Sequence, residues 1–217
     1  MFEHNILNLG LEKKQFLRSY GRRRGRNFSE NKLIDLERFL ASSEKLENLK
    51  SEIVLEVGFG FGEHMLKKAI DHPDKVFVGA EVYVNGIAKL LEQVKLHELS
   101  NVLIWNNDVR LLLEKLRCKV FREVYILFPD PWPKKKHHKR RIVDVSFLQL
   151  LGRSLHTLAE VVIATDDQDY AQQIYQSALK VFSKVEDTEI PKSATRFASK
   201  ASNRIFGYRM VYNATDA

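Results

Sequence analysis

A Pro-Asp-Pro-Trp-Pro segment at residues 129–133 is the feature of this sequence best suited to chemistry, because it carries a carboxylate on a stiff loop. Prolines fix φ, remove backbone donors and push preceding residues toward extended geometry, so Asp130 should project in a defined direction. A carboxylate can accept hydrogen bonds from the N1–H and N2–H₂ edge of a guanine and stabilise positive charge on its ring. If N7 of that base attacks a cationic methyl group, no proton has to leave, and alignment is the main requirement. We therefore expect Asp130 to be catalytic.

The same segment can also be interpreted as a rigid structural turn around a buried tryptophan. We favour that interpretation for Trp132 and find it incomplete for Asp130. The following residues, KKKHHKRR at 134–141, are basic, and Lys134 lies where it can bind a phosphate or a base carbonyl, with the next cations tracking the backbone. A second cluster, RSYGRRRGR at 18–26, taken alone is more typical of a solvated tail. Two basic patches in one small protein favour a phosphate-rich partner.

A glycine-rich stretch, LEVGFGFGEH, places Gly58, Gly60 and Gly62 where a buried strand should turn into a helix. Such a loop permits close approach of a ligand, although a simple tight turn is a serious alternative. A dinucleotide fingerprint would need a glycine at position 63, where this chain has Glu63. A carboxylate at that helix N-terminus would repel a diphosphate, so a phosphate-free ligand such as S-adenosylmethionine fits better.

Acidic residues follow three successive predicted strands. Glu56 can face the cationic methionine end of that ligand, and Glu81 can accept both ribose hydroxyls. Asp108 is placed to reach the adenine edge. Each acid alone could instead cap a helix or end a strand in solvent, and Asp108, directly before a helix, fits a cap best. The three together favour a cofactor pocket.

Alternating strands and helices must position these residues. The pattern predicts strands at 52–58, 75–82, 101–106, 123–128 and 160–165, with further strands near 183–189 and 205–212. Helices are expected after Ser29, with Leu33, Leu36 and Leu40 on one stripe, from about Glu63, and over 84–99, 109–116, 143–156 and 167–182. This alternation predicts an α/β fold with a parallel sheet covered on both faces, whose ligands bind at the carboxyl ends of the strands. We expect residues 1–28 to form a basic arm that can be mobile, and residues 29–217 to form one domain.

Composition and charge narrow the class of protein. The 217 residues include 35 basic and 28 acidic ones, which gives a net charge of +7 and agrees with an anionic partner. The single cysteine, Cys118, excludes an intrachain disulfide, and the seven histidines do not cluster at metal-ligand spacings, so we expect no metal. Without a secretory signal or an apolar stretch long enough to span a bilayer, we expect a cytoplasmic protein that does not enter a membrane.

The segments RSYGRRRGR, LEVGFGFGEH, GAEV, NND, LFPDPWPKKKHHKRR, ATDD and TRFASKA together resemble the bacterial tRNA (guanine-N7-)-methyltransferase family. The resemblance implies a Rossmann-like class I methyltransferase fold with an antiparallel C-terminal strand, S-adenosylmethionine as methyl donor, and methylation of a guanine in the tRNA variable loop. By motif position it implies cofactor contacts from Glu56, Glu81, Asp108 and Asp130, and tRNA contacts from Lys134, Asp166, Thr195, Arg196 and Phe197. The sequence departs from the family at Ala198, where glutamate is common.

Three other functions remain as alternatives. A methyltransferase acting on DNA amino groups would typically have two prolines and an aromatic after its acid, whereas Trp132 intervenes here. A non-catalytic RNA-binding module would not need acids at four strand ends, and a nicotinamide-dependent oxidoreductase is disfavoured by Glu63. The protein is expected to be a monomer or a homodimer.

Overall fold

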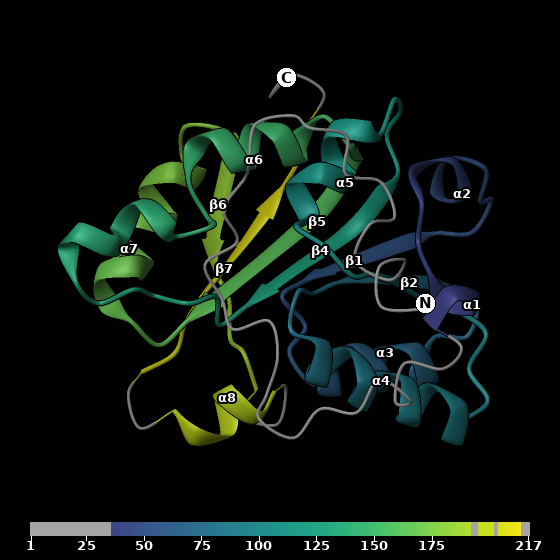
Figure 1. Cartoon of the computed structure of the whole chain (residues 1–217). Coiled ribbons are helices and arrows are strands. Elements are labelled where there is room, and N and C mark those ends of the chain that lie inside the picture. The colour runs from purple at the N-terminus through teal and green to yellow at the C-terminus, as the bar shows by residue number, and fades with distance from the viewer. Residues whose placement is uncertain (1–35, 192–194, 202–203, 214–217) are drawn as a thin grey trace.

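A seven-stranded sheet organises the molecule in the order β3-β2-β1-β4-β5-β7-β6 (Figure 1). The structure is a computed structural model, and it describes residues 36–191, 195–201 and 204–213. The strands are β1 (Ile53–Val57), β2 (Val76–Ala80), β3 (Val102–Trp105), β4 (Phe121–Leu127), β5 (Leu155–Thr165), β6 (Lys184–Asp187) and β7 (Phe206–Val211). Strands β1 to β5 pair in parallel, and β7 runs antiparallel to both β5 and β6. The predicted mostly parallel sheet with an antiparallel C-terminal strand is therefore confirmed.

Helices cover both faces of this sheet. Helices α3 and α4 lie on one face, and α5, α6 and α7 lie on the other (Figure 1). The helices are α1 (Leu36–Phe39), α2 (Ser43–Glu47), α3 (Glu63–Asp71), α4 (Val84–Leu96), α5 (Val109–Lys115), the 3₁₀ helix η2 (Lys135–Arg140), α6 (Val145–Gly152), α7 (Gln168–Ala178) and α8 (Arg196–Lys200). All five residues of β1 are buried, as expected for a central strand covered from both sides.

Two predicted segments differ from the structure. The helix expected over 143–156 ends at Gly152, and Leu155 begins a long β5 because it pairs with Phe121 at the start of β4. The basic run at 134–141, over which no helix was expected, forms η2 at Lys135–Arg140. Hydrophobic periodicity does not reveal η2, because charged residues dominate it and none of its residues is buried. The arm at 1–28 and the helix start at Ser29 lie outside the described residues.

The strand order reverses between β1 and β4. From β1 the chain proceeds through β2 to β3 on one side, and from β4 through β5 on the other. Ligands of doubly wound sheets bind in the crevice at such a switch point, beyond the carboxyl ends of the strands. The loops after β1 and β4, which hold the glycines and Asp130, therefore meet at this crevice.

Candidate active site

The glycine loop after β1 leaves room for a ligand. Gly58 and Gly60 adopt left-handed backbone angles, with φ of 70° and 58°. A side chain added at either position would meet no atom within 4 Å, so the space beside the loop is open. The loop is also fixed from behind, because a Cβ at Gly86 of α4 would lie 1.9 Å from the Gly60 carbonyl oxygen. Gly86 was not among the predicted site residues, since an isolated glycine inside a helix gives no sign of what it packs against.

Glu81 is bound to the glycine loop by its carboxylate. Its Oε2 accepts from the Gly60 amide at 2.7 Å, and its Oε1 accepts from the amides of Val82 and Tyr83 at 2.7 and 2.9 Å. Desolvation raises the pKa of Glu81, the three amide bonds oppose that effect, and the charge of Asp130 adds to it. Oε1 accepts two of these bonds and Oε2 accepts one, so Glu81 is oriented in advance and Oε2 can still accept from a ligand.

Glu56 and Asp108 already have protein partners. Glu56 is buried, and its Oε2 lies 2.7 Å from Nδ1 of His64 on α3. Asp108 caps α5 by accepting from the Arg110 amide at 2.9 Å, and the Arg110 guanidinium binds both of its oxygens at 3.0 and 2.6 Å. The alternative role of Asp108 as a helix cap is thus confirmed, while its adenine contact, like the ligand contact of Glu56, stays a prediction.

The loop that carries Asp130 is strained on both sides. Phe128 and Trp132, which are not glycines, have φ of 55° and 48°. Such residues are held in the left-handed region only where surrounding contacts over-determine them, often at functional sites. Asp130 itself is exposed, yet the surrounding protein desolvates its carboxyl group and raises its pKa. The rigid, projecting carboxylate predicted for this loop agrees with that arrangement.

The prediction that Trp132 is buried is wrong. Its ring is half-buried and lies between cationic and aromatic neighbours on η2, with the Arg140 guanidinium 4.9 Å from the ring centre and the His137 ring at 5.8 Å. The loop therefore packs against the basic helix rather than into the apolar core. Lys134 is exposed at the start of η2, where its carbonyl oxygen accepts from the His137 amide at 2.7 Å.

Helix α8 brings predicted tRNA-binding residues beside the cofactor loop. Thr195 caps this helix by accepting from the Ala198 amide at 3.0 Å, and the Arg196 guanidinium lies 5.7 Å from the ring centre of Phe61 in the glycine loop. Phe197 is 62% exposed, which is unusual for a phenylalanine. Ala198 is fully buried, so a glutamate there would need a different local packing. Asp166 lies half-buried at the end of β5, on the same edge of the sheet.

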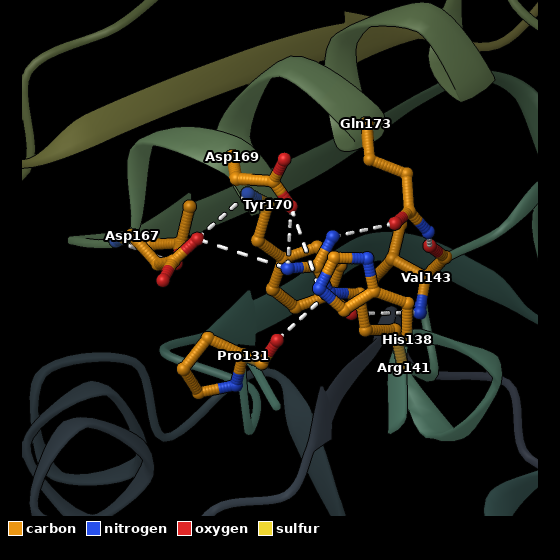
Figure 2. A network of polar contacts seen from close by, with 9 residues as sticks. Pro131, His138, Arg141, Val143, Asp167, Asp169, Tyr170 and Gln173 are labelled. Atoms are coloured by element: carbon orange, nitrogen blue, oxygen red, sulfur yellow. Dashed lines mark hydrogen bonds and ion pairs between the residues drawn. The ribbon is translucent and has the colours of Figure 1, made fainter. Parts of the chain in front are cut away.

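One residue of the basic run differs from its neighbours. Arg141 is buried, with only 2% of its side chain exposed, and it binds atoms of the Asp130 loop and of α7 (Figure 2). It was expected to belong with the backbone-tracking cations, and in the structure it faces protein atoms instead. The sequence contains one hint of this burial, because Arg141 directly precedes the apolar pair Ile142 and Val143.

Similarity to known proteins shows the class of fold to which this chain belongs. The family model described as "Putative methyltransferase" matches residues 50–208. The fold resembles an S-adenosylmethionine-dependent O-methyltransferase from Thermotoga maritima with a TM-score of 0.56 at 11% identity, over 85% of this chain and 71% of that one. Together with the strand order and the glycine loop, these findings define a class I methyltransferase fold.

Curated relatives give the particular family. The chain is 86% identical to a tRNA (guanine-N(7)-)-methyltransferase of Neorickettsia sennetsu over the full length of both chains. It is 41% identical to the enzyme of that name from Wolbachia pipientis wMel, over 61% of this chain and 60% of the relative. This chain belongs to the tRNA (guanine-N(7)-)-methyltransferase family.

The part of the chain that the structure describes can also be searched for metal ligands and for membrane-spanning helices. Within 36–191, 195–201 and 204–213, no three His, Cys, Asp or Glu side chains group together as metal ligands would. In that same part of the chain, no helix combines the length and apolarity needed to cross a bilayer.

Proposed function

We infer that this protein transfers a methyl group from S-adenosylmethionine to N7 of a guanine in tRNA. The observation that carries this inference is the place of Asp130, on a strained loop between the cofactor crevice and a basic helix. Membership of the family, with a relative 86% identical over the whole chain, supports the same reaction. The finer proposal is that the target guanine lies in the variable loop.

The residues at the glycine loop fit the methyl donor. Gly58 and Gly60 leave open space, and Glu81 presents a carboxylate that three amides hold in place and whose Oε2 can still accept from a ribose hydroxyl. Glu63 is exposed in the first turn of α3, where its charge opposes a diphosphate. We propose that Glu56 and Asp108 complete this pocket, alongside their bonds to His64 and Arg110. When bound, the donor supplies an electrophilic methyl group on a sulfonium.

The protein then has to orient the acceptor. The N7 lone pair forms the new bond to carbon while the bond from sulfur to carbon breaks and its electrons stay on sulfur, so no proton is removed. We propose that Asp130 accepts from the N1–H and N2–H₂ edge of the guanine and stabilises the positive charge that the ring acquires. Lys134, Asp166 and residues 195–197 are proposed to hold the nucleotide and its phosphates around this base.

Methyl transfer to a defined tRNA tests this proposal. Purified protein is incubated with methyl-labelled S-adenosylmethionine and an unmodified tRNA transcript, and the label is mapped by nuclease digestion and mass spectrometry. We expect 7-methylguanosine at one position in the variable loop. The Asp130→Ala variant should lose at least about 10²-fold in turnover, as expected when a group that stabilises transition-state charge is removed. Label on DNA or protein but never on tRNA would contradict the proposal.

The setting of the reaction is a separate proposal. We propose that the protein acts in the cytoplasm, where tRNA is matured, as a monomer or a homodimer. Its net charge of +7 supports binding to an anionic partner of this kind. Light scattering on the purified protein, alone and with tRNA, distinguishes the two oligomeric states.

A further inference from the structure

Arg141 connects the Asp130 loop to α7 through its guanidinium group (Figure 2). Its Nε donates to the Pro131 carbonyl oxygen at 2.7 Å, and its Nη1 donates to Oε1 of Gln173 at 2.7 Å. Its Nη2 lies 2.7 Å from Oδ2 of Asp169 and 3.9 Å from Oδ1 of Asp167. Each of the three nitrogens of the planar guanidinium therefore binds a different residue.

The surroundings fix the plane of that guanidinium. Its carbon lies 4.7 Å from the ring centre of Tyr170, a fully buried residue whose hydroxyl accepts from the Val143 amide at 3.0 Å. Gln173, which accepts from Arg141, also donates to the Val143 carbonyl oxygen at 3.2 Å. Stacking and hydrogen bonding thus hold Arg141 in one orientation, with little of its side chain accessible to a phosphate.

The Asp130 loop needs such an external partner. Its three prolines have no N–H group, so they cannot donate to the loop's own carbonyl oxygens. The carbonyl that Arg141 binds belongs to Pro131, directly between the proposed catalytic acid and Trp132 with its φ of 48°. A charge-assisted bond at that point stabilises the left-handed turn and with it the direction of the Asp130 side chain.

We propose that Arg141 is a positioning residue that sets the geometry of Asp130, and that it does not contact the tRNA. The inference rests on the proposed function, because Asp130 must act in the reaction for its placement to matter. A base displaced by about 1 Å from its reactive arrangement can lose about 10²-fold in rate. Through Asp167 and Asp169, the same guanidinium ties the start of α7, next to the predicted tRNA contact Asp166, to the Asp130 loop.

The test compares two substitutions in the same basic run. Arg141→Lys keeps the charge and loses the planar fork, so we expect kcat to fall about ten-fold or more, with KM for tRNA and the salt dependence of KM unchanged. Lys139→Gln alters an exposed cation on η2. We expect it to raise KM for tRNA, to reduce the slope of log KM against log salt by about 1, and to leave kcat unchanged.

Two further measurements separate positioning from folding. Affinity for S-adenosylhomocysteine, measured by calorimetry, should be unchanged in Arg141→Lys, because the glycine loop and Glu81 do not touch Arg141. If Arg141→Lys does not fold, Asp169→Asn replaces it, since Asp169 is exposed and removing its charge weakens its ion pair with Arg141 and a longer one, 3.7 Å, with His138. We expect kcat of Asp169→Asn to fall about two- to five-fold, as for the loss of an ion pair whose carboxylate is exposed to solvent.

The outcomes are distinct. Wild-type kcat in Arg141→Lys, or in Asp169→Asn where the first variant fails to fold, would overturn the positioning role. A raised KM with a smaller salt slope and an unchanged kcat in Arg141→Lys would make it a tRNA contact and also overturn it. If the wild-type protein itself did not methylate tRNA, the proposed function would fail first, whatever the variants did.

Discussion

The two halves of the active site are stabilised in different ways. The half proposed to bind the cofactor, called the cofactor half, comprises residues 56–62, Glu81 and Asp108 at the ends of β1 to β3. The half proposed to bind the substrate, called the substrate half, comprises residues 128–141 and the start of α7 at 166–173. In the cofactor half, each acid is held by a group that is near it in the sequence: Glu56 by His64, Glu81 by the Val82 amide, and Asp108 by Arg110. In the substrate half, one buried guanidinium joins segments that are 10 and 32 residues away from it.

We infer that binding of the cofactor and alignment of the guanine depend on separate sets of contacts. The cofactor half consists largely of backbone donors and glycines, so its shape depends mainly on how the backbone packs. The substrate half contains strained backbone that side chains must hold in place. Substitutions in the first half should therefore act on cofactor affinity, and substitutions in the second on turnover.

Among substitutions that test the difference between the two halves, Glu81→Gln should have the largest effect, a loss of cofactor affinity. A neutral amide replaces a carboxylate that accepts from Gly60, Val82 and Tyr83, and one of its ends now presents donors to those amides. Loss of hydrogen bonds to a charged group should weaken S-adenosylhomocysteine binding by about 10- to 100-fold. Calorimetry measures that affinity, and filter binding shows whether tRNA affinity is retained as expected.

The matched control for Glu81→Gln is Glu92→Gln on α4. Glu92 is an exposed acid that pairs with Lys89 on its own helix, so its substitution should leave cofactor affinity unchanged. Equal cofactor affinities in Glu81→Gln and Glu92→Gln would show that the carboxylate of Glu81 does not belong to the binding site.

The sequence alone predicted that the residues of the cofactor half lie at strand ends, because the patterns that place them there are short-range. Glycines that end a strand and acids that follow successive strands form patterns within a few residues, and the parallel topology then brings them to one edge. The sequence did not reveal Gly86, whose role depends on the approach of α4 to the Gly60 carbonyl. It also did not show that Glu56 and Asp108 are already paired, since neither pairing changes the pattern of residue types.

The substrate half was predicted less completely. The stiffness of residues 129–133 follows from proline chemistry and could be stated in advance. The burial of Arg141 could not, because the apolar pair that follows it is only a weak hint and the sequence does not show which groups its guanidinium binds. Those partners on α7 lie about thirty residues away, and only the tertiary structure brings them together.

The second prediction concerns how α4 supports the glycine loop. In Gly86→Ala the new methyl group would lie 1.9 Å from the Gly60 carbonyl oxygen, a backbone atom, so the loop has to move. Overpacking of this kind typically lowers the free energy of unfolding by about 1–3 kcal/mol, and we expect weaker S-adenosylhomocysteine binding as well.

Gly152→Ala on α6 serves as the control for that substitution. Its added Cβ would lie 3.1 Å from the ring of Tyr212, away from the crevice. Urea unfolding should therefore show the larger destabilisation in Gly86→Ala, where the added methyl group meets backbone, and calorimetry should show reduced cofactor affinity in Gly86→Ala alone. An unchanged affinity in Gly86→Ala would contradict the idea that α4 sets the position of the loop.

The smallest expected effect is on the free energy of unfolding, which Asp130 should lower and Asp169 should raise at neutral pH. Desolvation raises the pKa of Asp130, so its contribution to stability is present below the unfolded value of 3.8 and is lost as pH rises through the folded value. Asp130→Asn should therefore gain stability relative to wild type between pH 4 and 7. The gain should stay below about 1 kcal/mol, because the residue is exposed and solvent screens the effect.

Asp169 should show the opposite sign. The hydrogen bond from Arg141 lowers the pKa of Asp169, so its contribution is present above 3.8 and is lost as pH falls through the lowered folded value. Asp169→Asn should be less stable than wild type at pH 7, and the difference should shrink toward acid pH. Urea unfolding of both variants across this range checks the two slopes. Slopes of the same sign would mean that the two acids do not play opposite roles, and that the link between Asp169 and Arg141 does not stabilise the substrate half.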